Sequence, residues 1–185
     1  MNRRQWLMVI VLLATWMGVL RYNRSVMMSG ANLPAPIMDI SASPSKVSTG
    51  WTILDSSGKP FDWSKAKDKL VLVNVWATWC GPCRAELPSL ESLSKNEKLK
   101  DKLVVLCVSG DDRPEQLREF LKRNTLDFPA YFVPELPSEF VTEGIPATFL
   151  ISSEGKLLAS DVGSARWDAP EFVEKLEKLA EKTGS

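Results

Sequence analysis

Residues 70–83 read Leu-Val-Leu-Val-Asn-Val-Trp-Ala-Thr-Trp-Cys-Gly-Pro-Cys, and this stretch carries the strongest fold signal in the chain. It begins with an apolar, Val-rich run, which is typical of a strand buried on both faces. Pro82 suits the first turn of a helix, because its φ is already helical and its missing N–H needs no partner there. The stretch therefore predicts a buried strand, then a surface turn, and then a helix that begins at the two cysteines.

The position of Cys80 at the predicted helix N-terminus favours its ionised form. Unpaired backbone N–H groups and the helix dipole stabilise an anion there, and the thiolate is the nucleophile in disulfide exchange. Cys83 lies one turn further on, close enough to attack a mixed disulfide on Cys80. Gly81 leaves the approach to the first sulfur free, and Trp79 offers a partly exposed aromatic surface beside it. We therefore expect thiol–disulfide exchange through Cys80, at the surface, and Cys83.

Other interpretations of the cysteines remain open at this point. The chain has three cysteines and no histidine, so a four-ligand structural zinc site is very hard to build. A pair of inert core cysteines is the other alternative, although Gly-Pro between them opens a helix at the surface. The third cysteine, Cys107, lies among Val and Leu and is expected to be a small buried hydrophobe, with a redox role as the alternative. We expect no metal and no cofactor.

The composition excludes several classes of function. The chain has 185 residues, of which 44% are hydrophobic and 25% charged, enough for one domain with a proper core. Lys plus Arg number 23, as do Asp plus Glu, so the basic excess typical of nucleic-acid binding is missing. The lack of histidine removes Ser-His-Asp triads and imidazole metal ligands.

The apolar pattern of residues 47–185 predicts an α/β domain with a mixed central sheet flanked by helices. Strand–helix–strand units require right-handed crossovers and parallel pairs, and a final strand–strand–helix unit adds an antiparallel edge. A hairpin is expected around a turn cluster at 56–59. The expected strands are 70–76, 103–108, 147–152 and 157–162, and the expected helices start at 82, after a capping sequence at 112–115, and at 168.

The N-terminal segment, residues 1–24, predicts a membrane anchor or signal helix. An uncharged run at 6–20 follows Arg3 and Arg4. The run is about 15 residues long, or about 22 Å as a helix at roughly 1.5 Å per residue. A membrane-spanning helix usually has roughly 17–25 residues, so this run is shorter than usual. We expect an uncleaved anchor, with a cleaved signal peptide or a buried core helix as alternatives. Residues 25–46 are rich in Pro and Ser and predict a linker.

Residues 72–88, Leu-Val-Asn-Val-Trp-Ala-Thr-Trp-Cys-Gly-Pro-Cys-Arg-Ala-Glu-Leu-Pro, resemble the thioredoxin superfamily. More narrowly, they resemble the extracytoplasmic TlpA-, ResA- and CcmG-type thiol–disulfide oxidoreductases. The sequence Gly-Ile-Pro-Ala-Thr at 144–148 resembles the family's cis-proline loop. The resemblance therefore implies a thioredoxin-like fold, a cis bond before Pro146, a loop that faces the cysteines, and backbone hydrogen bonds from Ile145 to a substrate strand.

Two polar positions follow from the same resemblance. Asn74 lies where cytoplasmic thioredoxins carry a buried acid, and Asn is frequent there in the membrane-anchored branch. Glu86 lies three residues after Cys83, where a Glu influences cysteine acidity in ResA-like proteins. We expect Glu86 to manage the proton of Cys83 or to contact the partner. The alternative is a solvated carboxylate that stabilises the helix dipole.

The resemblance also implies a function and partners. A membrane-tethered reductase outside the cytoplasm would act on disulfide-containing targets, such as apocytochrome c or copper-site cysteines of oxidase assembly proteins. A CcdA- or DsbD-type membrane thiol reductase would return its electrons. The Gly-Pro dipeptide, as in reducing thioredoxins, favours the reductant role. The alternatives are a thiol oxidant, a thiol peroxidase, whose Pro-x-x-x-Thr-x-x-Cys setting is missing, and a non-catalytic binding or chaperone module.

Overall fold

The computed structural model describes residues 5, 6, 8, 13–18, 32–40, 45–111, 113–124 and 127–183. Most of the predicted anchor or signal helix at 1–24 lies outside these residues and stays a prediction. Within the described residues, none of the helices combines the length and the apolar character that crossing a membrane requires. Asp112, the first residue of the predicted capping sequence, also lies outside the described residues.

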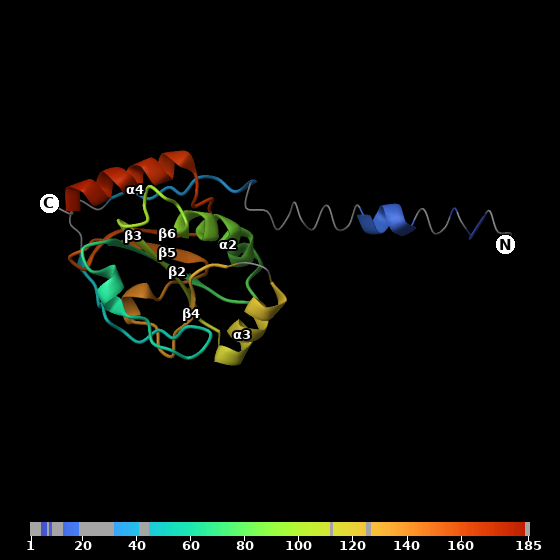
Figure 1. Ribbon diagram of the computed structural model, residues 1–185, viewed down its shortest axis with the longest axis horizontal. Helices are drawn as coiled ribbons and strands as arrows, with labels where there is room; N and C mark the ends of the chain where they lie inside the picture. Colours follow the sequence, from blue (N-terminus) through green and yellow to red (C-terminus); the bar gives the residue numbers. More distant parts are fainter. Residues whose placement is uncertain are drawn as a thin grey trace.

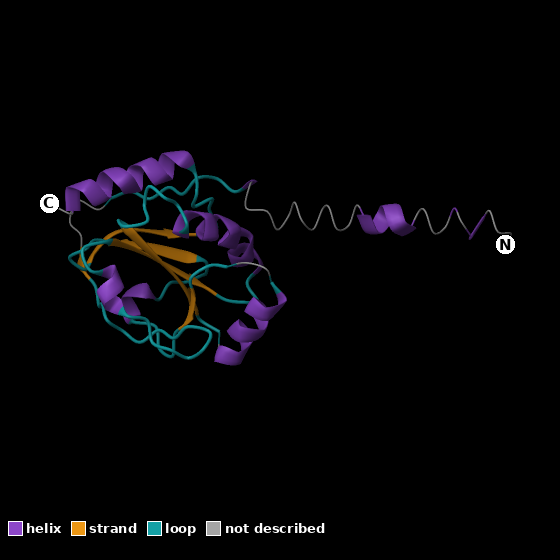
Figure 2. Ribbon diagram, in the orientation of Figure 1, coloured by secondary structure: helices purple, strands orange, loops and turns teal. Residues whose placement is uncertain are grey.

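A mixed sheet of six strands forms the centre of the domain, in the order β1-β6-β5-β2-β3-β4 (Figures 1 and 2). β2, β3 and β4 are parallel neighbours, whereas β5 pairs antiparallel with both β2 and β6. The predicted mixed sheet is therefore confirmed. The strands are β1 (Ser45–Lys46), β2 (Leu70–Trp76), β3 (Leu103–Ser109), β4 (Ala130–Phe132), β5 (Ala147–Ile151) and β6 (Lys156–Val162).

Helices cover the two faces of this sheet unequally. α2 (Gly81–Ser94) and α4 (Pro170–Thr183) lie together on one face (Figure 1). Loops and the short 3-10 helices η2 (Trp63–Ala66) and η3 (Ser138–Phe140) cover the other face (Figure 2). α3 (Pro114–Arg123) lies beside β4. The active-site helix of the predicted fold is thus α2, which follows directly after the central strand β2.

The side chains of β2 divide between two hydrophobic clusters. Leu72 and Trp76 belong to the cluster beneath α2 and α4, and Val73 belongs to the cluster on the opposite face. All seven residues of β2 are buried. A strand covered on both faces has no solvent-facing side, which explains why its sequence is apolar without alternation except at Asn74.

The sequence did not predict two of the strands, β1 and β4. β4 has three residues and β1 has two, too short for a periodic pattern. β4 is held by its pairing with β3, where Ala130 lies opposite Cys107. The expected hairpin at 50–63 is reduced to a single antiparallel bridge between Leu54 and Pro60. The predicted turn is present, and Gly58 in it has a positive φ of 86°, which glycine adopts without strain.

Part of the range predicted as a linker packs against the domain. Met38 is 1% exposed and belongs to the cluster beneath α2 and α4. The backbone N–H of Arg166 donates to the carbonyl of Pro34 at 2.8 Å, and Lys175 Nζ donates to the carbonyl of Met38. These contacts hold residues 32–40, which precede the first strand, alongside α4 (Figure 1).

Candidate redox site

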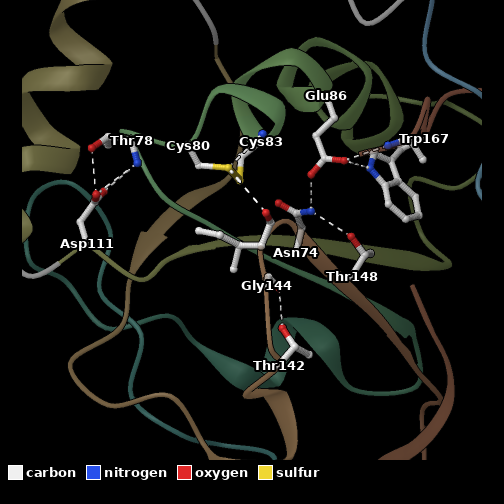
Figure 3. The surroundings of a disulfide bond; sticks show 12 residues. Asn74, Thr78, Cys80, Cys83, Glu86, Asp111, Thr142, Gly144, Thr148 and Trp167 are labelled. Carbon is white, nitrogen blue, oxygen red and sulfur yellow. Dashed lines mark hydrogen bonds between the residues drawn. A yellow bond between two sulfur atoms is a disulfide. The ribbon is translucent and has the colours of Figure 1, made fainter. Parts of the chain in front are cut away.

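A disulfide joins Cys80 and Cys83 at the N-terminus of α2 (Figure 3). Cys80 is the N-cap residue of the helix and Pro82 lies in its first turn. The backbone N–H of Cys83 donates to Sγ of Cys80 at 3.2 Å. The first sulfur thus occupies the place where a side-chain oxygen usually caps a helix. The same N–H and the helix dipole will stabilise a thiolate there once the disulfide is reduced.

The two sulfurs differ in access. Cys80 is 5% exposed and Cys83 is 0% exposed, while Trp79 beside them is 69% exposed. Gly81 and Pro82 are also exposed. The sequence predicted a surface position for Cys80. In the disulfide form Cys80 is instead almost fully buried. Of the two cysteines, Cys80 is therefore the one that an external thiolate or disulfide can approach.

The loop before β5 faces the disulfide. The Ile145–Pro146 bond is cis, as the family resemblance implied. The carbonyl oxygen of Ile145 lies 3.8 Å from Sγ of Cys80. Thr142 Oγ1 donates to the carbonyl of Gly144 at 2.7 Å, which holds the loop from the side away from the cysteines (Figure 3). The loop that carries the cis bond therefore lies directly beside Cys80.

Behind the disulfide lies a buried polar group of four residues, which we call the Glu86 cluster: Asn74, Glu86, Thr148 and Trp167, each 0% exposed. Asn74 Nδ2 donates to Glu86 Oε1 at 2.8 Å and to Thr148 Oγ1 at 2.9 Å. Trp167 Nε1 donates to Glu86 Oε2 at 2.8 Å, and the backbone N–H of Ala165 donates to the same oxygen at 3.1 Å (Figure 3). These donors come from β2 and from the loop between β6 and α4.

The solvated alternative for Glu86 is wrong, because its position on α2 points into the interior. Burial raises the pKa of Glu86 to about 7, although the hydrogen bonds from Trp167, Asn74 and Ala165 favour its ionised form. The negative charge of Asp161 raises the same pKa further. A carboxyl group with this pKa can accept and release a proton near neutral pH, one helical turn from Cys83.

A second buried carboxylate supports the segment that leads into the cysteines. Asp111 is 4% exposed. It accepts hydrogen bonds from the backbone N–H of Thr78 at 3.1 Å and from Thr78 Oγ1 at 2.8 Å (Figure 3). It also accepts a hydrogen bond from Ser109 Oγ at 2.5 Å. These bonds tie the segment just before Trp79 to the end of β3.

Sequence reasoning missed both Asp111 and Trp167. Asp111 follows a predicted buried strand, and the carboxyl ends of neighbouring parallel strands lie together; that rule could have placed it near Cys80. Trp167 lies in a loop before the last helix, and no local pattern distinguishes it. Its partner Glu86 is 81 positions away in the sequence.

The third cysteine lies in the core. Cys107 is free and 0% exposed, and burial raises the pKa of its thiol well above the usual value. A thiol in this state is a poor nucleophile. The structure therefore agrees with the prediction of a buried hydrophobe. Within the described part of the chain, no group of three or more His, Cys, Asp or Glu is placed to hold a metal ion.

Known proteins resemble this chain in sequence and in structure. The thioredoxin-like protein YneN of Bacillus subtilis is 34% identical over 112 residues, which cover 58% of this chain and 65%, just under two thirds, of YneN. The thiol-disulfide oxidoreductase ResA of Bacillus thuringiensis subsp. konkukian is 27% identical over 134 residues, which cover 71% of this chain and 77% of ResA.

Among solved structures, the exposed lipoprotein thioredoxin of Streptococcus pneumoniae matches with a TM-score of 0.61 and 26% identity, covering 70% of this chain and 98% of that one. The Redoxin family model matches residues 35–179, which include the whole sheet and the Cys80–Cys83 disulfide. The chain therefore belongs to the Redoxin family and, within it, resembles the thioredoxin-fold thiol–disulfide oxidoreductases.

Proposed function

We propose that the chain is a membrane-tethered thiol–disulfide reductase that acts on target proteins outside the cytoplasm. The observation that carries this proposal is the asymmetry of the disulfide at the start of α2. Sγ of Cys80 accepts the helix N–H and belongs to the only cysteine of the pair with exposed surface, whereas Cys83 is 0% exposed beside a buried acid. One sulfur is thus suited to attack a partner and the other to resolve the adduct.

The proposed cycle moves two electrons from the reduced pair to the target. The Cys80 thiolate attacks the target disulfide, so that a bond forms between Cys80 and one target sulfur and the other target sulfur leaves as a thiolate. Cys83 then loses its proton, which Glu86 accepts, and attacks Sγ of Cys80. The second target sulfur leaves as a thiolate and takes up a proton, and the Cys80–Cys83 disulfide of the structure remains.

The partners in this cycle follow from the family resemblance. A reductant in an oxidising compartment must be reduced again, and we propose a CcdA- or DsbD-type membrane thiol reductase as the electron donor. Cysteines of apocytochrome c or of copper-site assembly proteins are the proposed targets. The segment 1–24 would hold the domain near such membrane donors. The similarity to the thiol-disulfide oxidoreductase ResA and to the thioredoxin-like protein YneN supports the exchange chemistry. The proposed direction of electron transfer, from this chain to the target, rests on the Gly-Pro dipeptide between the cysteines.

Replacement of the resolving cysteine tests the mechanism directly. In Cys83→Ser the Cys80 thiolate can attack a target, but the mixed disulfide cannot be released by an internal thiol. We expect covalent adducts to accumulate in cells, to disappear on reduction, and to identify the partners by mass spectrometry. The double variant Cys80→Ser/Cys83→Ser is the matched control and should form none. A Cys83→Ser protein that forms no adduct beyond this control contradicts the proposed exchange.

The direction of electron flow has its own test. A reductase of this kind is expected to have a reduction potential below about −200 mV, in the range of thioredoxins and glutaredoxins. The potential is measured by equilibration of the Cys80–Cys83 pair with glutathione buffers of known ratio, followed by alkylation. A value well above about −200 mV would instead assign the chain to the thiol oxidants.

A further inference from the structure

The carboxylate of Glu86 is held by donors that carry no charge. Oε1 accepts from Asn74, and Oε2 accepts from Trp167 and from the backbone N–H of Ala165. Trp167 is the only aromatic donor of this set and its ring also packs edge-to-face on Phe172, with ring centroids 5.5 Å apart. The indole N–H therefore has a fixed position and stabilises the ionised carboxylate.

A row of polar residues leads from this carboxylate to the edge of the sheet. Asn74 on β2 lies opposite Thr148 on β5, and Thr148 lies opposite Asp161 on β6. Side chains of directly opposed residues share one face of the sheet, with Cβ atoms about 4.5–5.5 Å apart. Ala159, two residues before Asp161, packs in the cluster beneath α2 and α4. The carboxylate of Asp161 therefore lies on the face that carries Glu86.

Asp161 sits where this row meets solvent. β1 pairs with β6 only at Leu157 and Lys156, so the part of β6 that carries Asp161 has no strand beyond it among the described residues. Asp161 is partly exposed. Partial burial raises its pKa from the usual value. A negative charge at this place opposes the ionised form of Glu86, whereas the indole N–H favours it.

We infer that Trp167 and Asp161 are positioning residues of the redox site, which act through Glu86 and set the pH range in which Cys83 can release its proton. The inference rests on the proposed function, in which Glu86 accepts that proton. The two residues act in opposite senses: the indole N–H favours a charged Glu86, and the Asp161 carboxylate disfavours it.

Other ionisable groups face Glu86 as well. Cys83 lies one turn before it on α2, and Cys107 lies opposite Asn74 in the register of β2 and β3. Arg166 lies between Ala165 and Trp167 in the loop, but its Nε pairs with Asp168 Oδ1 at 3.5 Å. The thiol of Cys107 is neutral at physiological pH because burial raises its pKa. Asp161 carries a charge that raises the pKa of Glu86, so a single substitution at Asp161 changes the field at Glu86.

The test measures the titration of Glu86 in the oxidised full-length protein, where neither Cys80 nor Cys83 can titrate. The carboxyl carbon of Glu86 is followed by NMR as a function of pH. Trp167→Phe keeps the ring and removes the N–H, so we expect the midpoint to rise by about one pH unit. Asp161→Asn keeps the size and removes the charge, so we expect the midpoint to fall by about half a pH unit.

The reduced proteins supply the second readout. The rate at which Cys83 resolves a mixed disulfide formed at Cys80 is measured against pH, and its midpoint is expected to move in the same direction as that of Glu86 in each variant. Glu154→Gln is the matched control, because Glu154 is exposed on the turn before β6 and pairs with Lys156. It should leave both midpoints unchanged.

Each outcome decides the inference. Opposite shifts in the two variants, followed by the resolution rate, support it. The inference is overturned if both variants shift the Glu86 midpoint in the same direction or leave it unchanged. It is also overturned if the midpoint of the resolution rate does not move with that of Glu86. Asp161 lies at the partly exposed sheet edge, so Asp161→Asn keeps the test valid if the buried Trp167→Phe variant does not fold. If the chain had no exchange activity, the proposed function would be wrong, but the NMR titration of Glu86 could still be measured. A failure of the proposed function can therefore be told apart from a failure of this inference.

Discussion

Cys80→Ser removes the attacking sulfur, and we expect disulfide reduction by this chain to fall by roughly 10³-fold or more. A serine hydroxyl is not ionised near neutral pH and cannot form a disulfide, so neither the first nor the second step of the cycle can occur. Its oxygen can still accept the N–H of Cys83 as an N-cap, which preserves the start of α2. The measurement is the reduction of insulin disulfides with dithiothreitol as electron donor.

Cys107→Ala is the matched control for this result. Cys107 is a buried free thiol that packs in the cluster beneath α2 and α4. The alanine variant removes a cysteine without touching the pair at the helix start, and it should reduce insulin at the wild-type rate. If Cys80→Ser reduced insulin at the wild-type rate, Cys80 would not be the attacking sulfur. A binding or chaperone module that uses the same surface without chemistry would instead show no insulin reduction in the wild-type protein, and Cys80→Ser would leave its binding intact.

The free energy of unfolding of the oxidised protein is expected to fall as the pH rises from about 4.5 to about 7, the interval between the ordinary and the folded pKa of Glu86. In this interval the folded chain keeps the proton of Glu86, whereas the unfolded chain has lost it. The stabilisation is complete below about 4.5 and disappears as the pH rises through about 7. A raised pKa of this size corresponds to about 3 kcal/mol.

Denaturant unfolding at pH 4.5, 6 and 8 measures this slope, and Glu86→Gln should remove most of it. The partly exposed Asp161, whose pKa is also raised, contributes a remainder of the same sign. The amide is neutral at every pH, although one of its N–H groups must face a donor and lowers stability by a pH-independent amount. Glu91→Gln is the control, since Glu91 lies on the same helix and forms a surface ion pair with Lys95 at 2.8 Å. Among the exposed acids, Glu139 has a pKa lowered to about 2. This shift changes the free energy of unfolding only below about pH 4.5, outside the measured interval. A Glu86→Gln protein with the wild-type slope would assign it to another group.

Local patterns were sufficient for the main elements and for the reactive pair. The apolar run at 70–76 predicted β2, and the Cys-Gly-Pro-Cys sequence at 80–83 predicted the start of α2, because strand burial and helix capping depend on neighbours in the chain. The proposed role of Cys80 as the attacking sulfur rested on its place at a helix N-terminus. The cis bond before Pro146 came from family resemblance, since X–Pro dipeptides are mostly trans.

The environment of Glu86 could not be obtained in this way. Residues 83–86 alone did not distinguish a Glu86 that manages the proton of Cys83 or contacts the partner from a solvated carboxylate that stabilises the helix dipole. Its donors Asn74 and Trp167 are 12 and 81 positions away, and they reach it only because β2 and the loop before α4 pack on α2. The pKa of an acid depends on how much water and how many donors surround it. Periodicity and capping report the conformation of a segment, whereas desolvation arises only when distant segments come together.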